Sequence, residues 1–411
     1  MLENQGKRKY IPFDSGTTTS FALDNLFHWG EKTIMKTRLL ALCGIMLAVS
    51  STSNALPRFS SRMNLPCKSC HVNPSGGGMR NQFGQDFGRE QLAVKQWQQE
   101  YGLEEFSTKI SDFLSYGSDF RFLSFYQTRS NPDASSTSFF PMQMDLYLNL
   151  AVSKKISLYL NPAFGPYNRL EAFVVAKVLP VSGYIKAGRF APPHGLRPDD
   201  HTSFTRQATP FRNNTGQQSG VEFGFGPSPF RLMGAVTNGM SGDIDGGLAK
   251  AVFGKVEANG SLGPVNLLGG ISSYNDASSG EKLNLQEAYG AVTLWQRLTV
   301  IGTMERIQGN SPAMSVNSDR NQRNGVGANL KQLALMVEAD YLLTDGVDFK
   351  LMYDFFDPNT DVKGGSATRY SAGIEFIPVS GVEVRPLLRY TEDTLLRRNI
   401  TDLHVLFHIY L

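Results

Sequence analysis

Two cysteines and a histidine stand together in the segment Cys67-Lys68-Ser69-Cys70-His71. This C-x-x-C-H spacing is the attachment signature of c-type haem. Each thiol can add across one vinyl group of a porphyrin, and the next residue then lies under the iron and supplies an axial nitrogen. The residues therefore predict one covalent haem c, held by Cys67 and Cys70, with His71 as an axial iron ligand.

The second axial ligand is a separate question, for which Met79 is the candidate. It follows Gly76-Gly77-Gly78, and a glycine run can take unusual dihedrals and approach a flat ligand closely. Eight extended residues span at most ~27 Å, enough to pass round a haem edge. Met63 is a second candidate, and either methionine can instead simply pack against the porphyrin. An open sixth position would allow chemistry at the iron.

Four arginines flank the motif: Arg58, Arg62, Arg80 and Arg89. Arginine pairs with carboxylates through two parallel hydrogen bonds, so each of them is a candidate partner of a haem propionate. The other interpretation is ordinary solvated charge, which we prefer for any single one of them.

Two other chemistries use paired cysteines. A thioredoxin-like pair expects a βαβ context, and none is visible in the sequence. A structural zinc site usually has two such pairs, whereas one pair is present here with no second histidine nearby. Haem is therefore the preferred interpretation.

The elements that must position these residues follow an expected export signal. Residues 1–34 are polar and aperiodic, and we interpret them as a non-native or disordered extension. A basic segment at 35–38, an apolar run at 39–49 and small residues at 53–55 predict a signal peptide over residues 35–55. Residues 56–115 then form a small α-helical monohaem domain, with a helix expected over residues 89–101.

From about residue 115 onward the sequence alternates between apolar and polar residues. Segments of about ten alternating residues, separated by short and long turns, are typical of outer-membrane barrels. We therefore predict an all-β fold, an antiparallel outer-membrane β-barrel of about 16 strands over residues 116–411. The rival is a soluble β-sandwich or β-helix. The clearest alternating runs are 142–150, 156–161, 170–178, 218–226, 229–238, 248–262, 265–275, 283–294, 296–306, 333–343, 347–357, 367–377 and 381–391.

The connection that runs from Phe190 through Arg206 and Arg212 to Gly216 is longer than a turn between two strands needs, so we expect it to have a function. It carries His194, Asp199 and Asp200. Either it folds into the pore as a constriction whose charges set ion selectivity, or it is a plain surface loop.

Two smaller patterns lie nearer the C-terminus. By the alternation, His404 and His408 lie on the expected lumen face, where we interpret them as water-exposed pore residues and not as metal ligands. Asp357, Asn359 and Asp361 alternate like a calcium loop, but valine stands where the sharp turn needs glycine, which favours a turn without metal.

The balance of basic and acidic residues indicates which classes of partner the protein can bind. Lys plus Arg total 40 and Asp plus Glu total 37, a formal net charge of +3. Nucleic-acid binding usually needs a basic stripe, so we expect no nucleic-acid partner. Outer-membrane lipid is the expected environment of the barrel.

The segment Ala55-Leu56-Pro57-Arg58-Phe59-Ser60-Ser61-Arg62, with the C-x-x-C-H motif and a barrel after it, resembles the fused monohaem cytochrome–porins of the outer membrane. Their best-known members are iron(II) oxidases. The resemblance implies electron transfer between a periplasmic cytochrome or other carrier and an extracellular donor or acceptor such as iron, by an Fe(II):cytochrome oxidoreductase or a plain electron carrier. The haem domain would lie on the periplasmic side or inside the lumen. The stretch 73–79 differs from that of the iron oxidases, which leaves the donor open.

Two other functions stay open at this point. One is a diffusion porin whose haem-bearing domain is a plug or a periplasmic redox partner. The other is an enzyme acting at an open haem site on a small molecule such as a peroxide. Homo-oligomerisation is also open.

Overall fold

The computed structural model describes residues 57–101, 107–129, 135–162, 164, 170–211, 216–226, 229–241, 247–278, 282–310, 329–394 and 397–411. The expected extension and signal peptide lie outside these ranges. Among the described residues, no helix is long and apolar enough to cross a membrane.

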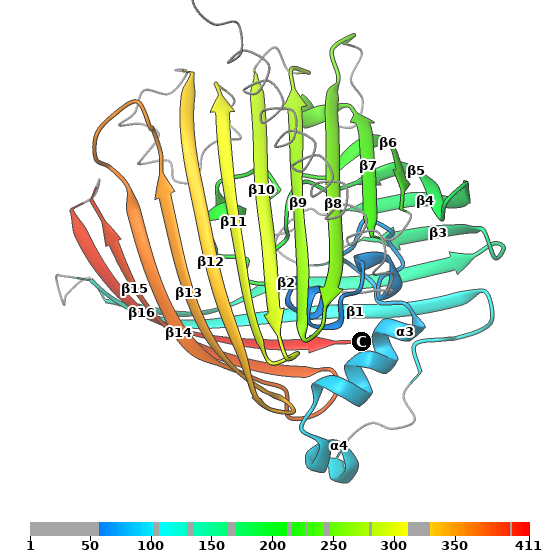
Figure 1. Ribbon diagram of the computed structural model, residues 1–411, viewed down its shortest axis with the longest axis horizontal. Helices are drawn as coiled ribbons and strands as arrows, with labels where there is room; N and C mark the ends of the chain where they lie inside the picture. Colours follow the sequence, from blue (N-terminus) through cyan, green and yellow to red (C-terminus); the bar gives the residue numbers. More distant parts are fainter. Residues whose placement is uncertain are drawn as a thin grey trace, which may run out of the picture. The chain divides into compact units, whose positions relative to one another are not determined.

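The strands close into one antiparallel barrel of 16 strands in which each strand pairs with its sequence neighbours and β1 pairs with β16 (Figure 1). The predicted strand number and fold are confirmed. The strands are β1 (Leu114–Arg129), β2 (Ser136–Ala151), β3 (Ile156–Asn161), β4 (Glu171–Leu179), β5 (Gly183–Phe190), β6 (Gln218–Phe225), β7 (Phe230–Thr237), β8 (Ala251–Leu262), β9 (Val265–Asp276), β10 (Leu283–Leu294), β11 (Leu298–Gly309), β12 (Leu330–Thr344), β13 (Val347–Asp357), β14 (Ala367–Phe376), β15 (Val382–Asp393) and β16 (Arg398–Tyr410).

The alternation of apolar and polar residues in the sequence corresponds to the outer and inner faces of the barrel. On β13, Phe349 and Leu351 are exposed on the outer face, while Lys350, Met352 and Asp354 are buried in the lumen. Successive side chains of a strand point to opposite faces, so the same pattern recurs round the barrel. The result is an apolar outer surface and an interior rich in charged side chains, the arrangement of barrels that sit in a bilayer.

The two rims of the barrel differ. The turns after β2, β4, β6, β8, β10, β12 and β14 are short, and the long connections all lie at the other rim. At one short turn, Trp295 and Gln296 take positive φ values of 49° and 57°. This tight turn delays the start of β11 to Leu298, although the alternation suggested residue 296.

The segment before the barrel is helical, as predicted, but its second half is broken. The expected helix over 89–101 is interrupted at Ala93, which is extended. The break occurs because the amide of Val94 bonds to the carbonyl of Ile377 at the short-turn rim, at 3.0 Å. Elements here are α2 (Pro57–Met63), η1 (Cys67–Ser69), α3 (Gln82–Phe87), η2 (Gly88–Leu92) and α4 (Lys95–Tyr101); α5 (Phe204–Gln207) and η5 (Gly239–Ser241) belong to the barrel's connections.

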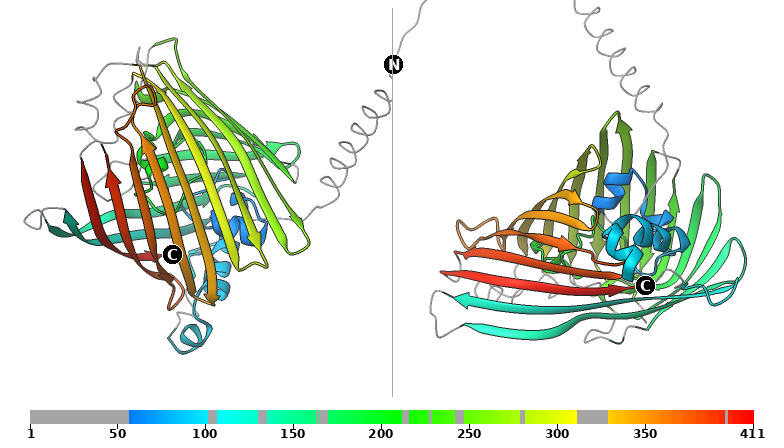
Figure 2. Two further views of the ribbon diagram at one scale, coloured as in Figure 1. Left: turned by 60° about the vertical axis from the view of Figure 1, so that its left-hand side comes forward. Right: turned by 90° about the horizontal axis from the view of Figure 1, so that it is seen from below.

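Helix α4 rests on the short-turn rim. Lys95 pairs with Asp345 at 2.8 Å, and the side-chain oxygen of Gln98 accepts from the amide of Ser380 at 2.7 Å. Figure 1 shows α3 beside the C-terminal end of β16, and Figure 2 shows the same helices from below. The helical segment therefore covers the rim that carries the short turns.

Helix α2 enters the lumen from that rim and is tied to the wall by polar contacts. Arg62 makes a two-pronged ion pair with Asp348 of β13, one contact being 3.1 Å. The hydroxyl groups of Ser61 and Thr293 lie 2.8 Å apart. These wall residues stand at strand ends next to short turns, so α2 lies near the rim and not at mid-barrel.

Candidate cofactor site

The C-x-x-C-H motif forms a single tight turn. The amides of Cys70 and His71 both donate to the carbonyl of Cys67, at 3.2 and 3.1 Å. One turn therefore carries both thiols and the imidazole, and all three line the same cavity inside the barrel. The two cysteines are not joined by a disulfide.

The His71 ring is held in one orientation. Its Nδ1 lies 3.1 Å from the carbonyl oxygen of Gly78, and a β-bridge joins His71 to Arg80. A histidine that gives its Nδ1 proton to a backbone carbonyl keeps the lone pair of Nε2 for a metal, the usual arrangement of a ligating imidazole. Burial lowers the pKa of His71 to about 4, so the ring is neutral at pH 7.

The three glycines before Met79 adopt backbone conformations that other residues rarely take. Gly76, Gly77 and Gly78 have φ values of +90°, +79° and +66°. A Cβ on Gly76 would lie 2.8 Å from the Cβ of Cys67, and one on Gly78 would lie 2.3 Å from the Tyr159 hydroxyl. The close approach is thus to Cys67 and to the barrel wall.

Two residues that hold the motif were missed in the sequence. Asn81 donates from its side chain to the carbonyl of Ser69 at 2.7 Å and accepts from the amide of Gly84 at 3.0 Å, so it caps α3 and fastens it to the turn. Lys186 of β5, fully buried, donates to Asn73 at 3.1 Å and to Ser75 at 2.8 Å. An asparagine before a helix is a readable cap signal; nothing local marks Lys186.

The surroundings disfavour the rival cysteine chemistries. Reactive cysteines of redox pairs are thiolates with a lowered pKa. Burial here raises the pKa of Cys67 and raises that of Cys70 to about 12, so both are thiols at pH 7. Among the described residues, Cys67, Cys70 and His71 do not form a cluster that converges on one ion. Spread around a turn and facing a cavity, they suit a larger group.

The cavity has a volume of about 180 Å³ and is partly open to solvent. Typical ligand pockets are roughly 300–1,000 Å³, so a porphyrin would need neighbouring side chains to move. It lies between the helical segment and the long β5–β6 connection, because residues of both line it, among them His71 and Arg197.

Two of the four candidate arginines line this cavity with buried donors that have no hydrogen-bond partner among the described residues. They are Nε and Nη1 of Arg58 and Nη1 of Arg80. Arg80 also stacks over the Tyr410 ring at 4.2 Å. Unsatisfied buried donors beside a cavity indicate a missing acceptor, and the carboxylates of haem propionates fit that need.

The simpler interpretation of the arginines as solvated charge is wrong for the two on α2. Arg58 and Arg62 are 3% and 5% exposed and pair with Glu375 and Asp348 of the wall. The lumen supplies buried partners that the sequence could not indicate. Arg89 does fit that interpretation, with a partly exposed pair to Asp86 at 2.7 Å.

Met79 lies beside the site but faces the wall. It is 1% exposed, belongs to the lumen's apolar cluster with Tyr147 and Tyr159, and does not line the cavity. Met63 is 39% exposed. In this arrangement the cavity contains both thiols and the imidazole, without a methionine sulfur.

The long connection after β5 folds into the lumen and is therefore not a plain surface loop, while its effect on ion selectivity stays a prediction. Asp199 pairs with Arg385 at 2.6 Å and with Arg121 at 3.2 Å, and Asp200 pairs with Arg389 at 2.7 Å. These partners stand on β1 and β15, which only β16 separates in the strand order, so they fix the loop to a part of the wall away from β5 and β6.

The predicted lumen face of His408 is confirmed, whereas its predicted exposure to water is wrong. His408 points into the lumen, but it is buried between Asp119 and Glu383 and is not a wet pore residue, because the lumen is packed at that level. The amide of Asn359 donates to Asp357 at 3.0 Å, closing a turn. Asp357 belongs to no metal-ligand cluster among the described residues.

Solved structures share the barrel. They include the anion-selective porin from Comamonas acidovorans (11% identity, 72% of this chain, 99% of the porin, TM-score 0.50) and OprB of Pseudomonas putida (10%, 73%, 94%, 0.53). OmpT of Vibrio cholerae is a third (12%, 74%, 100%, 0.50). No family model and no curated protein matches the chain.

The fold is therefore a closed barrel of 16 strands resembling outer-membrane porins, preceded by a small helical segment. The porin half of the predicted resemblance is shown at the level of fold. The comparisons give no support for a cytochrome fusion, so the haem rests on the chain's own residues.

Proposed function

We propose that this chain is an outer-membrane, porin-like barrel carrying one covalent haem c, and that it transfers electrons between a periplasmic carrier and an extracellular donor or acceptor. The observation that carries the proposal is the C-x-x-C-H turn, which opens onto a cavity inside a barrel. A one-electron carrier held there stands between the two sides of the membrane.

The roles of the residues follow from their geometry. Cys67 and Cys70 would hold the haem through two thioether bonds, and His71 would bind its iron through Nε2, because the Gly78 carbonyl holds Nδ1. Arg58 and Arg80 would offer their unpaired donors to the propionates. The haem, when bound, supplies reversible one-electron transfer at iron. The packing of Met79 against tyrosines leaves the sixth position unassigned.

The difference between the two rims indicates which end of the barrel would face the periplasm. Short turns of outer-membrane barrels face the periplasm and long loops face the outside. The helical segment lies at the short-turn rim, so a periplasmic cytochrome would dock there. The long loops then face the extracellular partner, with iron as one candidate and an Fe(II):cytochrome oxidoreductase as the corresponding enzyme.

The first experiment is a haem stain of purified outer membranes on a denaturing gel. The protein and its Cys67→Ala, Cys70→Ala variant are expressed in a host with c-type maturation machinery. We expect a haem-positive band that the variant loses. A full-length band without haem in the unaltered protein would refute the cofactor and with it the electron-transfer function.

Electron transfer itself needs a vesicle assay. The protein is reconstituted in liposomes with external Fe(II) and an enclosed cytochrome. Reduction of the cytochrome that depends on Cys67 and Cys70 supports the proposal, and its absence with haem-loaded protein would refute transmembrane transfer.

A diffusion porin with a haem-bearing plug is the second candidate, favoured by the inward loop with its charged residues. It predicts ion conductance independent of the haem's redox state and no electron flow across the bilayer.

A further inference from the structure

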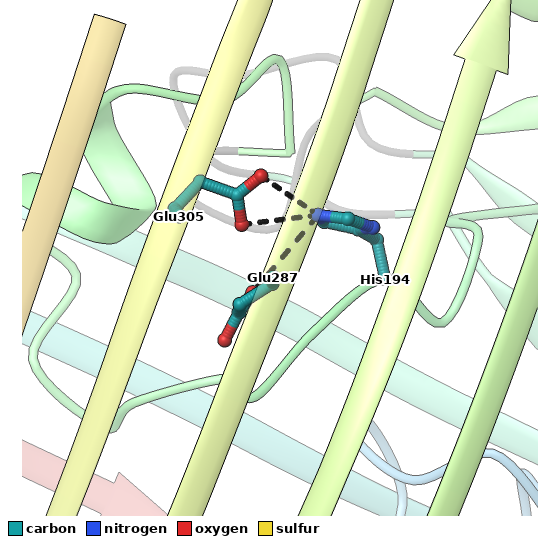
Figure 3. A group of neighbouring side chains, drawn as sticks. All are labelled: His194, Glu287 and Glu305. Atoms are coloured by element: carbon teal, nitrogen blue, oxygen red, sulfur yellow. Dashed lines mark hydrogen bonds and ion pairs between the residues drawn. The ribbon is translucent and has the colours of Figure 1, made fainter. Parts of the chain in front are cut away.

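A second group of metal-ligating side chains lies in the lumen, apart from the C-x-x-C-H turn. Glu287 of β10 and Glu305 of β11 are directly opposite each other in the strand register, and His194 of the inward loop reaches them (Figure 3). Their ligand atoms all lie within 4.8 Å of one another, and all three residues are buried.

Neither carboxyl group has a Lys or Arg partner among the residues that the structure describes. Like charges directly opposite on paired strands are destabilising, and burial without a partner adds a desolvation cost. Several other lumen carboxylates pair with Lys or Arg, as Glu222 does with Lys186 at 2.6 Å. Among the described residues, the one basic neighbour of Glu287 and Glu305 is His194.

Aromatic side chains surround the imidazole. Its edge faces the aromatic side chains of Phe211, Phe253 and Tyr274, with ring centroids 5.9, 6.3 and 6.5 Å away. The group thus lies in a largely dry part of the lumen.

The ring is oriented by its other nitrogen. Nδ1 of His194 lies 3.3 Å from Oγ of Ser272, which also accepts from the amide of Gly195 at 2.9 Å. With Nδ1–H donating to the hydroxyl, the lone pair of Nε2 points to the carboxylates. Such an outer partner is the regular companion of a metal-bound histidine.

The carboxylates are also positioned. Oε1 of Glu287 accepts from the amide of Leu196 at 2.9 Å and from the Thr303 hydroxyl, which turns Oε2 toward the cluster. Nε2 of His194 lies 3.1 Å from each oxygen of Glu305 and 4.0 Å from Oε2 of Glu287. Ligand atoms bound about 2.1 Å from one ion lie roughly 3–4.2 Å apart, so one ion can contact all three residues without a change of backbone.

We propose that His194, Glu287 and Glu305 bind one divalent first-row transition-metal ion. One imidazole with two carboxylates suits Zn²⁺, Fe²⁺ or Mn²⁺, whereas Ca²⁺ and Mg²⁺ prefer oxygen ligands alone. The ion would join the inward loop to β10 and β11. Gly195 and Leu196 line the haem-motif cavity, so the ion lies beside it, but its binding does not depend on a haem.

The test uses the full-length protein purified in detergent, stripped with a chelator and titrated with Zn²⁺ or Mn²⁺ by calorimetry. We expect one equivalent per chain. The Glu305→Gln variant keeps the side-chain shape and should lose at least about tenfold in affinity, the lower end of what even outer-shell changes cost. Glu257→Gln, at a lumen carboxylate paired with Arg231 at 2.6 Å, is the matched control and should bind normally.

Two further measurements separate the outcomes. The His194→Gln variant changes only the loop, so its loss of binding in a barrel that still migrates as folded on a gel cannot come from a damaged wall. The Cys67→Ala, Cys70→Ala variant should keep the metal, which separates this site from the haem. Absence of a stoichiometric ion in the unaltered protein, or equal affinity in Glu305→Gln, would overturn the proposal and favour two carboxyl groups sharing a proton.

Discussion

The buried ion pair between Arg62 and Asp348 should dominate the attachment of α2 to the barrel. The Arg62→Ala variant removes a two-pronged contact whose side chains are only 6% and 7% exposed, and it leaves Asp348 without its arginine. Removing one partner of a buried pair costs about 3–5 kcal/mol, which is roughly a 100- to 4000-fold larger population of undocked helix.

The assay is hydrogen–deuterium exchange of the purified protein. The amides of Asn64 and Leu65 bond to the carbonyls of Ser61 and Ser60, at 3.2 and 2.9 Å, so they report the docked helix end. We expect their exchange to accelerate by the factor given above. Amides in the middle of β13 should be unaffected, because the barrel closes without α2.

The matched control is Arg89→Ala on the same segment. Arg89 pairs with Asp86 at 2.7 Å, but those side chains are 31% and 36% exposed. An exposed pair contributes at most about 1 kcal/mol, or less than about a sixfold change. Equal effects of Arg62→Ala and Arg89→Ala would refute the reasoning, as would a double Arg62→Ala, Asp348→Ala variant that exchanges no more slowly than the single one.

Three more predictions follow from the cavity and the loop. Gly76→Ala, with φ of +90° and a Cβ 2.8 Å from that of Cys67, should reduce haem stain per protein severalfold; an unchanged stain would contradict this packing. Met79→Leu should leave the absorption spectrum of the haem-loaded protein unchanged, because Met79 packs outside the cavity, and a lost axial ligand would count against that placement. Burial raises the pKa of Asp200, but Arg389 and Arg369 outweigh it and hold the pKa well below its usual range. The stabilisation from this ion pair is therefore complete above about pH 4 and is lost as pH falls further, so single-channel conductance should rise only below about pH 4, and an Asp200→Asn variant should show the rise already at pH 7.

The sequence predicted the strands well because alternation reports a local property. A residue's place on the inner or outer face depends on its neighbours along the strand, and this is why the alternation over 347–357 correctly separates Phe349 and Leu351 from Lys350. The errors lie where a contact from elsewhere changes the local structure. Ala93 breaks the expected helix because the amide after it bonds to Ile377, more than 250 residues away, which no local pattern can indicate.

The sequence by itself determined the turn from Cys67 to His71 and the barrel that encloses it, because both follow from residue patterns over a few neighbouring positions. Only the tertiary structure decided which lumen side chains meet. Glu287 and Glu305 become partners through strand register, and His194 joins them because the loop after β5 turns inward. The physical reason is that alternation fixes the face of a side chain but not its partner across the lumen, which depends on closure of the whole barrel and on the cost of burying each charge.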